Sequence, residues 1–122
     1  MARILVIEDD EMMLALLRHI LGEAGHEIFP TADGPRGISL YKEHRPDVVL
    51  LDLALPTMNG LEVLRMIKGY DPKARVIVVT GYGSDESAEV AFRYGAFDFV
   101  QKPFEPAKLM ERIRLATTSG NT

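Results

Sequence analysis

Short, unbroken runs of apolar residues recur along this chain at even intervals, and they constrain its fold more than any other feature. Five runs have the length of a β-strand: residues 4–7, 27–30, 48–53, 76–80 and 97–100. Several are continuous in valine, isoleucine and leucine, whereas a strand with one face in water alternates apolar and polar residues. Continuous runs are typical of parallel strands that are covered on both faces.

Segments with a helical pattern lie between these runs. They are predicted at residues 11–24, 35–44, 61–70, 84–94 and 106–117, with Pro35 in a first turn and Ser84 as an N-cap. Gly37 is expected to weaken the second helix, because glycine costs about 0.5–1 kcal/mol relative to alanine there. Five strands that alternate with five helices predict an α/β fold with a parallel sheet and helices on both faces.

Length and composition favour one ordinary soluble domain in a reducing compartment such as the cytoplasm. The 122 residues include no cysteine, so disulfides and thiolate metal sites are excluded. The net charge is −4 without a basic cluster, which argues against direct nucleic-acid binding. The first apolar run is too short for a signal peptide or a membrane span. Residues 1–117 are expected to form the domain, and residues 118–122 a tail or the start of a linker.

Polar side chains follow the predicted strands where each strand ends. Glu8 and Asp9 follow the first strand, Asp52 ends the third, Thr80 ends the fourth and Lys102 comes after the fifth. Because parallel strands end at the same edge of a sheet, and ligands bind there, these side chains are expected to share one crevice.

The residue types in this crevice indicate metal and phosphate chemistry. Carboxylates that converge without histidine or cysteine repel one another unless a cation is present, and they suit a hard metal such as Mg²⁺. Lys102 and Thr80 are suited to a phosphate, and Asp52 to an aspartyl phosphate. Crowding should also raise the pKa of at least one of the three carboxyls, so Mg²⁺ or Asp→Asn at position 9 or 52 should raise the melting temperature.

Each of these residues also has a plain structural interpretation. Asp10, and less readily Asp9, suits the N-cap of the first helix, and Asp52 could begin a turn. Thr80 could be an ordinary strand-end threonine, and Lys102 a surface lysine. Their joint placement at one sheet edge is what favours the functional interpretation.

Several stretches in a fixed order resemble the receiver domain of two-component response regulators, over about residues 3–116. The resemblance rests on Ile4 to Asp10, Pro46 to Asp52, Pro56, Met58, Gly60 to Leu64, Val76 to Gly83, Gly95-Ala96 and Lys102-Pro103-Phe104. It implies the flavodoxin-like strand order 2-1-3-4-5.

The resemblance also implies roles for the acidic residues. Asp52 would accept a phosphoryl group from the phosphohistidine of a sensor histidine kinase or a phosphotransfer protein. Asp9 would bind Mg²⁺ directly, Glu8 would bind it through water, and the backbone carbonyl of Ala54 would be a further ligand. Such a domain is a regulatory switch and not an enzyme, apart from its own phosphorylation and slow dephosphorylation.

Residues near the phosphoryl group would transmit the conformational change that phosphorylation causes. Thr80 and Lys102 would contact the phosphoryl oxygens, Phe99 would be the aromatic residue that turns inward, and the peptide before Pro103 would be cis. The surface that changes would recruit a partner or a second copy of the chain. This sequence departs from the commonest pattern at Glu8, where aspartate is more frequent, and at Phe99, where tyrosine is.

Two positions should set the lifetime of the phosphorylated form. In receivers, the side chains two residues after the aspartate and two after the threonine flank the path of the attacking water, and here they are Ala54 and Tyr82. Neither is expected to orient a water well, which predicts slow self-dephosphorylation.

Two other functions compete with this interpretation. An aspartyl-phosphate phosphatase or phosphotransferase usually needs a second carboxylate close after the nucleophile, where this chain has Ala54. A flavin-binding module would need a hydroxyl- and amide-rich loop after the first strand, where this chain is acidic.

Overall fold

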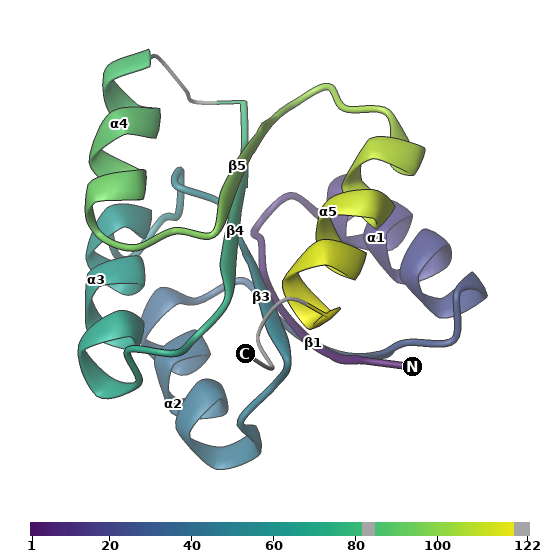
Figure 1. Cartoon of the computed structure of the whole chain (residues 1–122), viewed down its shortest axis with the longest axis horizontal. Coiled ribbons are helices and arrows are strands. Elements are labelled where there is room, and N and C mark those ends of the chain that lie inside the picture. Colours follow the sequence, from purple (N-terminus) through teal and green to yellow (C-terminus); the bar gives the residue numbers. More distant parts are fainter. Residues whose placement is uncertain (82–84, 119–122) are drawn as a thin grey trace.

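The computed structural model describes residues 1–81 and 85–118, which form an open parallel sheet with helices on both faces (Figure 1). The strands are β1 (Arg3–Ile7), β2 (Glu27–Thr31), β3 (Val48–Leu51), β4 (Val76–Thr80) and β5 (Asp98–Gln101). The helices are α1 (Glu11–Glu23), α2 (Gly34–His44), α3 (Gly60–Tyr70), α4 (Asp85–Arg93) and α5 (Pro106–Thr118). The strand order β2-β1-β3-β4-β5 confirms the predicted fold.

Each face of the sheet carries its own hydrophobic core. Helices α1 and α5 cover one face, and α2, α3 and α4 cover the other (Figure 1). On β3, Val48 and Leu50 pack with Leu17 of α1 and Leu109 of α5, whereas the alternate residues pack into the α2–α4 core. The central strands are therefore apolar without interruption because both of their faces are buried.

Several element boundaries differ from the predicted ones by one or two residues. The largest difference is at β3, which ends at Leu51 and not at residue 53. Its pairing with β1 ends at the pair Ile7 and Leu51, and the Asp52 carboxylate then accepts a hydrogen bond from the N–H of Ala54 at 3.0 Å. This side chain-to-backbone bond begins a turn and ends the strand. The predicted N-cap, Ser84, lies outside the described residues.

Gly37 also has a packing role, which the helix propensity of glycine did not reveal. A Cβ atom at this position would lie 2.5 Å from Cδ1 and 2.9 Å from Cγ1 of Ile7, whose side chain is fully buried. The missing side chain lets α2 approach β1 closely, and tighter packing offsets the low helix propensity of glycine.

None of the helices in residues 1–81 and 85–118 is long and apolar enough to span a membrane.

Candidate functional site

The predicted polar residues meet at the carboxyl edge of the sheet. Glu8 follows β1, Asp52 follows β3 and Thr80 is the last residue of β4, and these three strands are neighbours in the sheet. All three side chains are buried, with relative exposures of 2%, 6% and 0%. Lys102 reaches them from the loop after β5, and Asp9 lies exposed at the rim.

Lys102 bridges the two buried carboxylates. Its Nζ donates to Oε1 of Glu8 at 2.6 Å and to Oδ2 of Asp52 at 3.0 Å. The lysine side chain is 16% exposed, so this is a largely desolvated cluster and not a surface ion pair. One positive charge therefore lies between two negative charges in a poorly solvated place. Removal of any one of the three groups would leave buried charge without its partner.

Asp52 is held as a carboxylate by three donors. Burial opposes its ionisation, but the N–H of Ala54, the hydroxyl of Thr80 and the ammonium of Lys102 outweigh burial and lower the pKa of Asp52. Oγ1 of Thr80 donates to Oδ1 at 2.8 Å. Because the charged form is favoured, Asp52→Asn is no longer expected to stabilise the fold, contrary to the expectation from crowding alone.

The crowding of the carboxylates affects chiefly the pKa of Glu8. Burial raises the pKa of Glu8, and the charge of Asp52 adds to this, while hydrogen bonds from Lys102 and from the N–H of Asp10 act in the opposite direction. The net direction is upward, which confirms that at least one of the three carboxyls has a raised pKa.

The three carboxylates are placed to hold a cation. One oxygen from each of Glu8, Asp9 and Asp52 lies within 4.8 Å of the others. An all-oxygen set with one member at the surface suits Mg²⁺, which keeps several of its waters. The residues present therefore fit the metal that the resemblance implies. Ala54 contacts Asp52 through its N–H, and the role of its carbonyl as a ligand stays a prediction.

Comparison with known proteins identifies the family. Residues 4–114 match the family model of the response regulator receiver domain. The chain belongs to this family. It is 41% identical to the protein CcdB of Bacillus subtilis over 93% of this chain and 95% of that protein. It is 35% identical to the chemotaxis protein CheY of Thermotoga maritima, over 91% and 93% of the two chains.

Solved receiver structures agree with the fold. A CheY-like receiver domain protein from Methanospirillum hungatei superposes with a TM-score of 0.92 at 30% identity, over 97% of this chain and 94% of that one. A receiver domain from Clostridium thermocellum gives the same TM-score at 31% identity, over 98% and 96%. This chain is thus the receiver domain of a two-component response regulator.

Asp10 stands apart from the site of this receiver domain. Its Oδ1 accepts hydrogen bonds from the N–H groups of Met12 at 2.9 Å and Met13 at 3.3 Å, so it is the N-cap of α1. Its own N–H donates to Oε2 of Glu8 at 3.0 Å. The structural interpretation of Asp10 is confirmed, and its N–H helps to orient the Glu8 carboxylate.

The predicted switch residues lie on one face of the receiver sheet. Val78 pairs with Phe99 and Thr80 with Gln101, so Thr80 and Phe99 point to the same side, toward α4. Phe99 is half-buried against the core on that side. The peptide between Lys102 and Pro103 is cis, as the resemblance implied. Tyr82 lies outside the described residues.

Two further residues shape the loop between β3 and α3, and the sequence pattern did not single out either for this role. A Cβ on Gly60 would lie 2.4 Å from Cα of Leu53 and 2.6 Å from the carbonyl oxygen of Asp52. Thr57 donates its hydroxyl to Oδ1 of Asp33, the N-cap of α2, at 2.7 Å. Asn59-Gly60 gave a turn signal, but the close approach of Gly60 to the site follows only from the tertiary structure.

Proposed function

We propose that this receiver domain takes a phosphoryl group onto Asp52 from the phosphohistidine of a sensor kinase or a phosphotransfer protein. A carboxylate oxygen of Asp52 forms the new bond to phosphorus, and the bond between phosphorus and the histidine nitrogen breaks. The observation that carries the proposal is the Asp52 carboxylate itself, which is buried, kept ionised and held between Lys102 at 3.0 Å and Thr80 at 2.8 Å.

The surrounding residues supply charge and orientation for this transfer. The Lys102 ammonium and the Thr80 hydroxyl already point at Asp52, so both can turn to phosphoryl oxygens with little reorganisation. Glu8, Asp9 and Asp52 would hold Mg²⁺, with the carbonyl of Ala54 as a further ligand. When bound, Mg²⁺ neutralises charge on the phosphoryl oxygens.

Phosphorylation would change the surface formed by α4, β5 and α5. When the Thr80 hydroxyl turns to a phosphoryl oxygen, its place on the α4 side of the sheet changes, and Phe99 lies on the same side. An inward turn of Phe99 would reshape this surface so that it recruits a downstream partner or a second copy of the chain. The domain would act in the cytoplasm, without binding nucleic acid or membrane itself.

The phosphatase alternative has no support in the loop after Asp52. Residues 53–60 contain no acidic side chain, so no second carboxylate follows the nucleophile closely enough to act as acid and base. The chemistry proposed for the domain is limited to its own phosphorylation and dephosphorylation.

Asp9→Asn should raise the Mg²⁺ concentration needed for phosphorylation by acetyl phosphate at least about tenfold, because the cation loses a carboxylate ligand. Asp9 is exposed, so the fold should be kept. The matched control is Asp10→Asn, since asparagine also caps helices well. Phosphorylation is followed by intact mass over a series of Mg²⁺ concentrations. The same Mg²⁺ requirement in both variants would contradict the proposed metal site.

Ala54→Asn combined with Tyr82→Glu should speed loss of the phosphoryl group about tenfold, because a polar side chain can orient the attacking water. The wild-type domain should therefore dephosphorylate slowly. The measurement is the decay of the phosphorylated form in excess Mg²⁺ after the phosphodonor is removed. Equal decay rates, or slower decay in the double variant, would show that these two positions do not set the lifetime.

A further inference from the structure

The loop between β3 and α3 has few polar attachments along its middle. Near its ends, the N–H of Ala54 donates to the Asp52 carboxylate, and the N–H of Gly60 donates back across the loop, both at 3.0 Å. Between these bonds, the loop borders a hollow of about 540 Å³ on the side of α4. In the part of the chain that the structure describes, residues 55–58 make a single hydrogen bond, from the side chain of Thr57. The loop after the phosphoacceptor therefore depends on this bond for its polar attachment.

The acceptor of this bond is the carboxylate of Asp33, which also begins α2. The Thr57 hydroxyl donates to Oδ1 of Asp33 at 2.7 Å, and Oδ2 accepts from the N–H of Arg36 at 2.8 Å. The Thr57 hydroxyl and then the Arg36 N–H lower the pKa of Asp33, so this carboxyl is charged at neutral pH and both bonds are charge-assisted. Asp33 thus ties the loop after β3 to the start of α2.

Asp33 is joined to the other side of the acidic site as well. Its N–H donates to Oγ1 of Thr31 at 3.2 Å, and the carbonyl of Thr31 accepts from the N–H of Glu8 at 2.9 Å. A chain of hydrogen bonds therefore runs from Glu8 through Thr31 and Asp33 to Thr57. Glu8 and Asp52 are two of the three carboxylates placed to hold a cation, so this chain links the two segments that carry them.

Packing holds the start of α2 against the same loop. A Cβ atom on buried Gly34 would lie 3.1 Å from Cβ of Met58 in the loop and 3.0 Å from Cγ2 of Val63 in α3. An exposed hydrogen bond usually contributes little, because water competes for both partners. Here close packing beside the bond keeps Thr57 and Asp33 within reach of each other.

We propose that Thr57 and Asp33 are positioning residues for the phosphorylation of Asp52, because their bond holds the loop that carries Ala54 in the position required for Mg²⁺ binding. This inference rests on the proposed function. Without the bond, the loop would have to be ordered as Mg²⁺ binds, which weakens the binding. Saturating Mg²⁺ would restore the same arrangement. The expected signature is a higher Mg²⁺ requirement with an unchanged maximal rate.

Thr57→Val tests the bond directly, because valine keeps the shape of threonine and removes the hydroxyl. The Mg²⁺ concentration for half-maximal phosphorylation by acetyl phosphate should rise about threefold or more, and the rate at saturating Mg²⁺ should stay within about twofold. Thr57→Ser keeps the hydroxyl and should behave like the wild-type chain. Without metal or phosphodonor, hydrogen exchange of the Ala54 N–H should become about threefold faster or more in Thr57→Val.

Asp33→Ser tests the other partner. Serine still caps α2, but its side chain is too short to accept from Thr57 as well. The Mg²⁺ requirement should rise as much as in Thr57→Val. The double variant should stay within about twofold of either single variant, because both substitutions remove the same bond.

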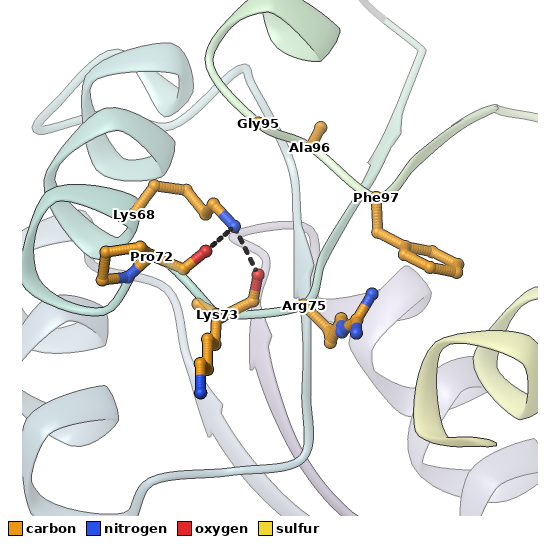
Figure 2. A pocket seen from close by; sticks show the side chains of 8 residues that line it. Lys68, Pro72, Lys73, Arg75, Gly95, Ala96 and Phe97 are labelled. Carbon is orange, nitrogen blue, oxygen red and sulfur yellow. Dashed lines mark hydrogen bonds between the residues drawn. The ribbon is translucent and has the colours of Figure 1, made fainter. Parts of the chain in front are cut away.

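Lys68 provides a matched control at the opposite edge of the sheet from Asp52. Its Nζ donates to the carbonyl oxygens of Pro72 at 2.6 Å and Ala74 at 2.9 Å, and so holds the loop between α3 and β4 (Figure 2). Lys68→Met removes both bonds and should destabilise the fold at least as much as Thr57→Val, as measured by denaturant unfolding. Its Mg²⁺ requirement and the exchange of the Ala54 N–H should stay within about twofold of the wild-type values.

Three results would overturn the proposal. They are an unchanged Mg²⁺ requirement and unchanged Ala54 exchange in Thr57→Val, the same changes in Lys68→Met, and effects that multiply in the double variant. A failure of the proposed function would look different, since the wild-type chain would not be phosphorylated on Asp52. In that case Ala54 exchange, and Mg²⁺ binding followed by amide chemical shifts, would still decide whether the bond positions the loop.

Discussion

Replacing Lys102 by Met should lower the free energy of unfolding by about 3 kcal/mol at neutral pH without Mg²⁺, because two buried carboxylates lose their shared cation. Methionine keeps most of the aliphatic volume, so packing changes little. Added Mg²⁺ should stabilise this variant more than the wild-type protein, because a cation can again lie between Glu8 and Asp52. Denaturant unfolding with and without Mg²⁺ measures both effects.

The pH dependence of this loss has a definite sign. The pKa of Glu8 is already raised from its ordinary value of 4.5, chiefly by burial, and Lys102 is one of the groups that limit the rise. A raised carboxyl pKa leaves stability intact below the unfolded value and lowers it as pH rises through the folded value. The deficit of the Lys102→Met variant should therefore shrink as pH falls toward 4.5.

Lys108→Met is the control for this prediction. Lys108 is an exposed lysine on α5 without a side-chain ion pair among the described residues, so its replacement should stay within about 0.5 kcal/mol. If Lys102→Met were as stable as Lys108→Met without Mg²⁺, the account of Lys102 as the internal counter-ion would be wrong.

Gly60→Ala should lower the free energy of unfolding by about 2 kcal/mol and slow phosphorylation by about tenfold or more. The new Cβ would lie 2.4 Å from Cα of Leu53 and 2.6 Å from the carbonyl oxygen of Asp52. Both are backbone atoms, so the chain around the phosphoacceptor must move, and a small displacement of reacting groups has a large effect on rate. Denaturant unfolding and the rate of phosphorylation by acetyl phosphate measure the two effects.

Gly69→Ala is a control in the same helix. No atom lies within 4 Å of a Cβ at this exposed position. Alanine should raise the free energy of unfolding there by about 0.5–1 kcal/mol and leave phosphorylation unchanged, because helix propensity alone differs. If Gly60→Ala and Gly69→Ala both stabilised the protein, the close approach at Gly60 would not be a constraint.

The fold could be predicted because the three central strands, β1, β3 and β4, are buried on both faces, and this burial is visible in the sequence as apolar runs. Two covered faces demand unbroken apolar runs, and right-handed crossovers leave few topologies. The strand order itself was predicted from the resemblance to receiver domains and not from the pattern of apolar runs. The end of β3 was missed because apolar Leu53 extends the run, while the turn is made by a bond from the Ala54 N–H to the Asp52 carboxylate.

The members of the site could be predicted, but their present interactions could not. Strand ends of a parallel sheet meet, which brought Glu8, Asp52 and Thr80 together. The bridge from Lys102 to Glu8 spans 94 positions in the sequence and depends on side-chain placement after folding. For the same reason, neither the opposite pKa shifts of Glu8 and Asp52 nor the close contact of Gly37 with Ile7 could be derived from residue types.

The central claim is that Asp52 is the phosphoacceptor, and direct mapping of the phosphorylated residue tests it. The protein is treated with acetyl phosphate and Mg²⁺, and the acyl phosphate is reduced with borohydride, which marks the modified aspartate for peptide mass spectrometry. The account predicts one modified residue, Asp52, with no labelling in the presence of EDTA or in Asp52→Asn. Labelling that persists in Asp52→Asn, or that maps to another residue in the wild-type chain, would contradict it.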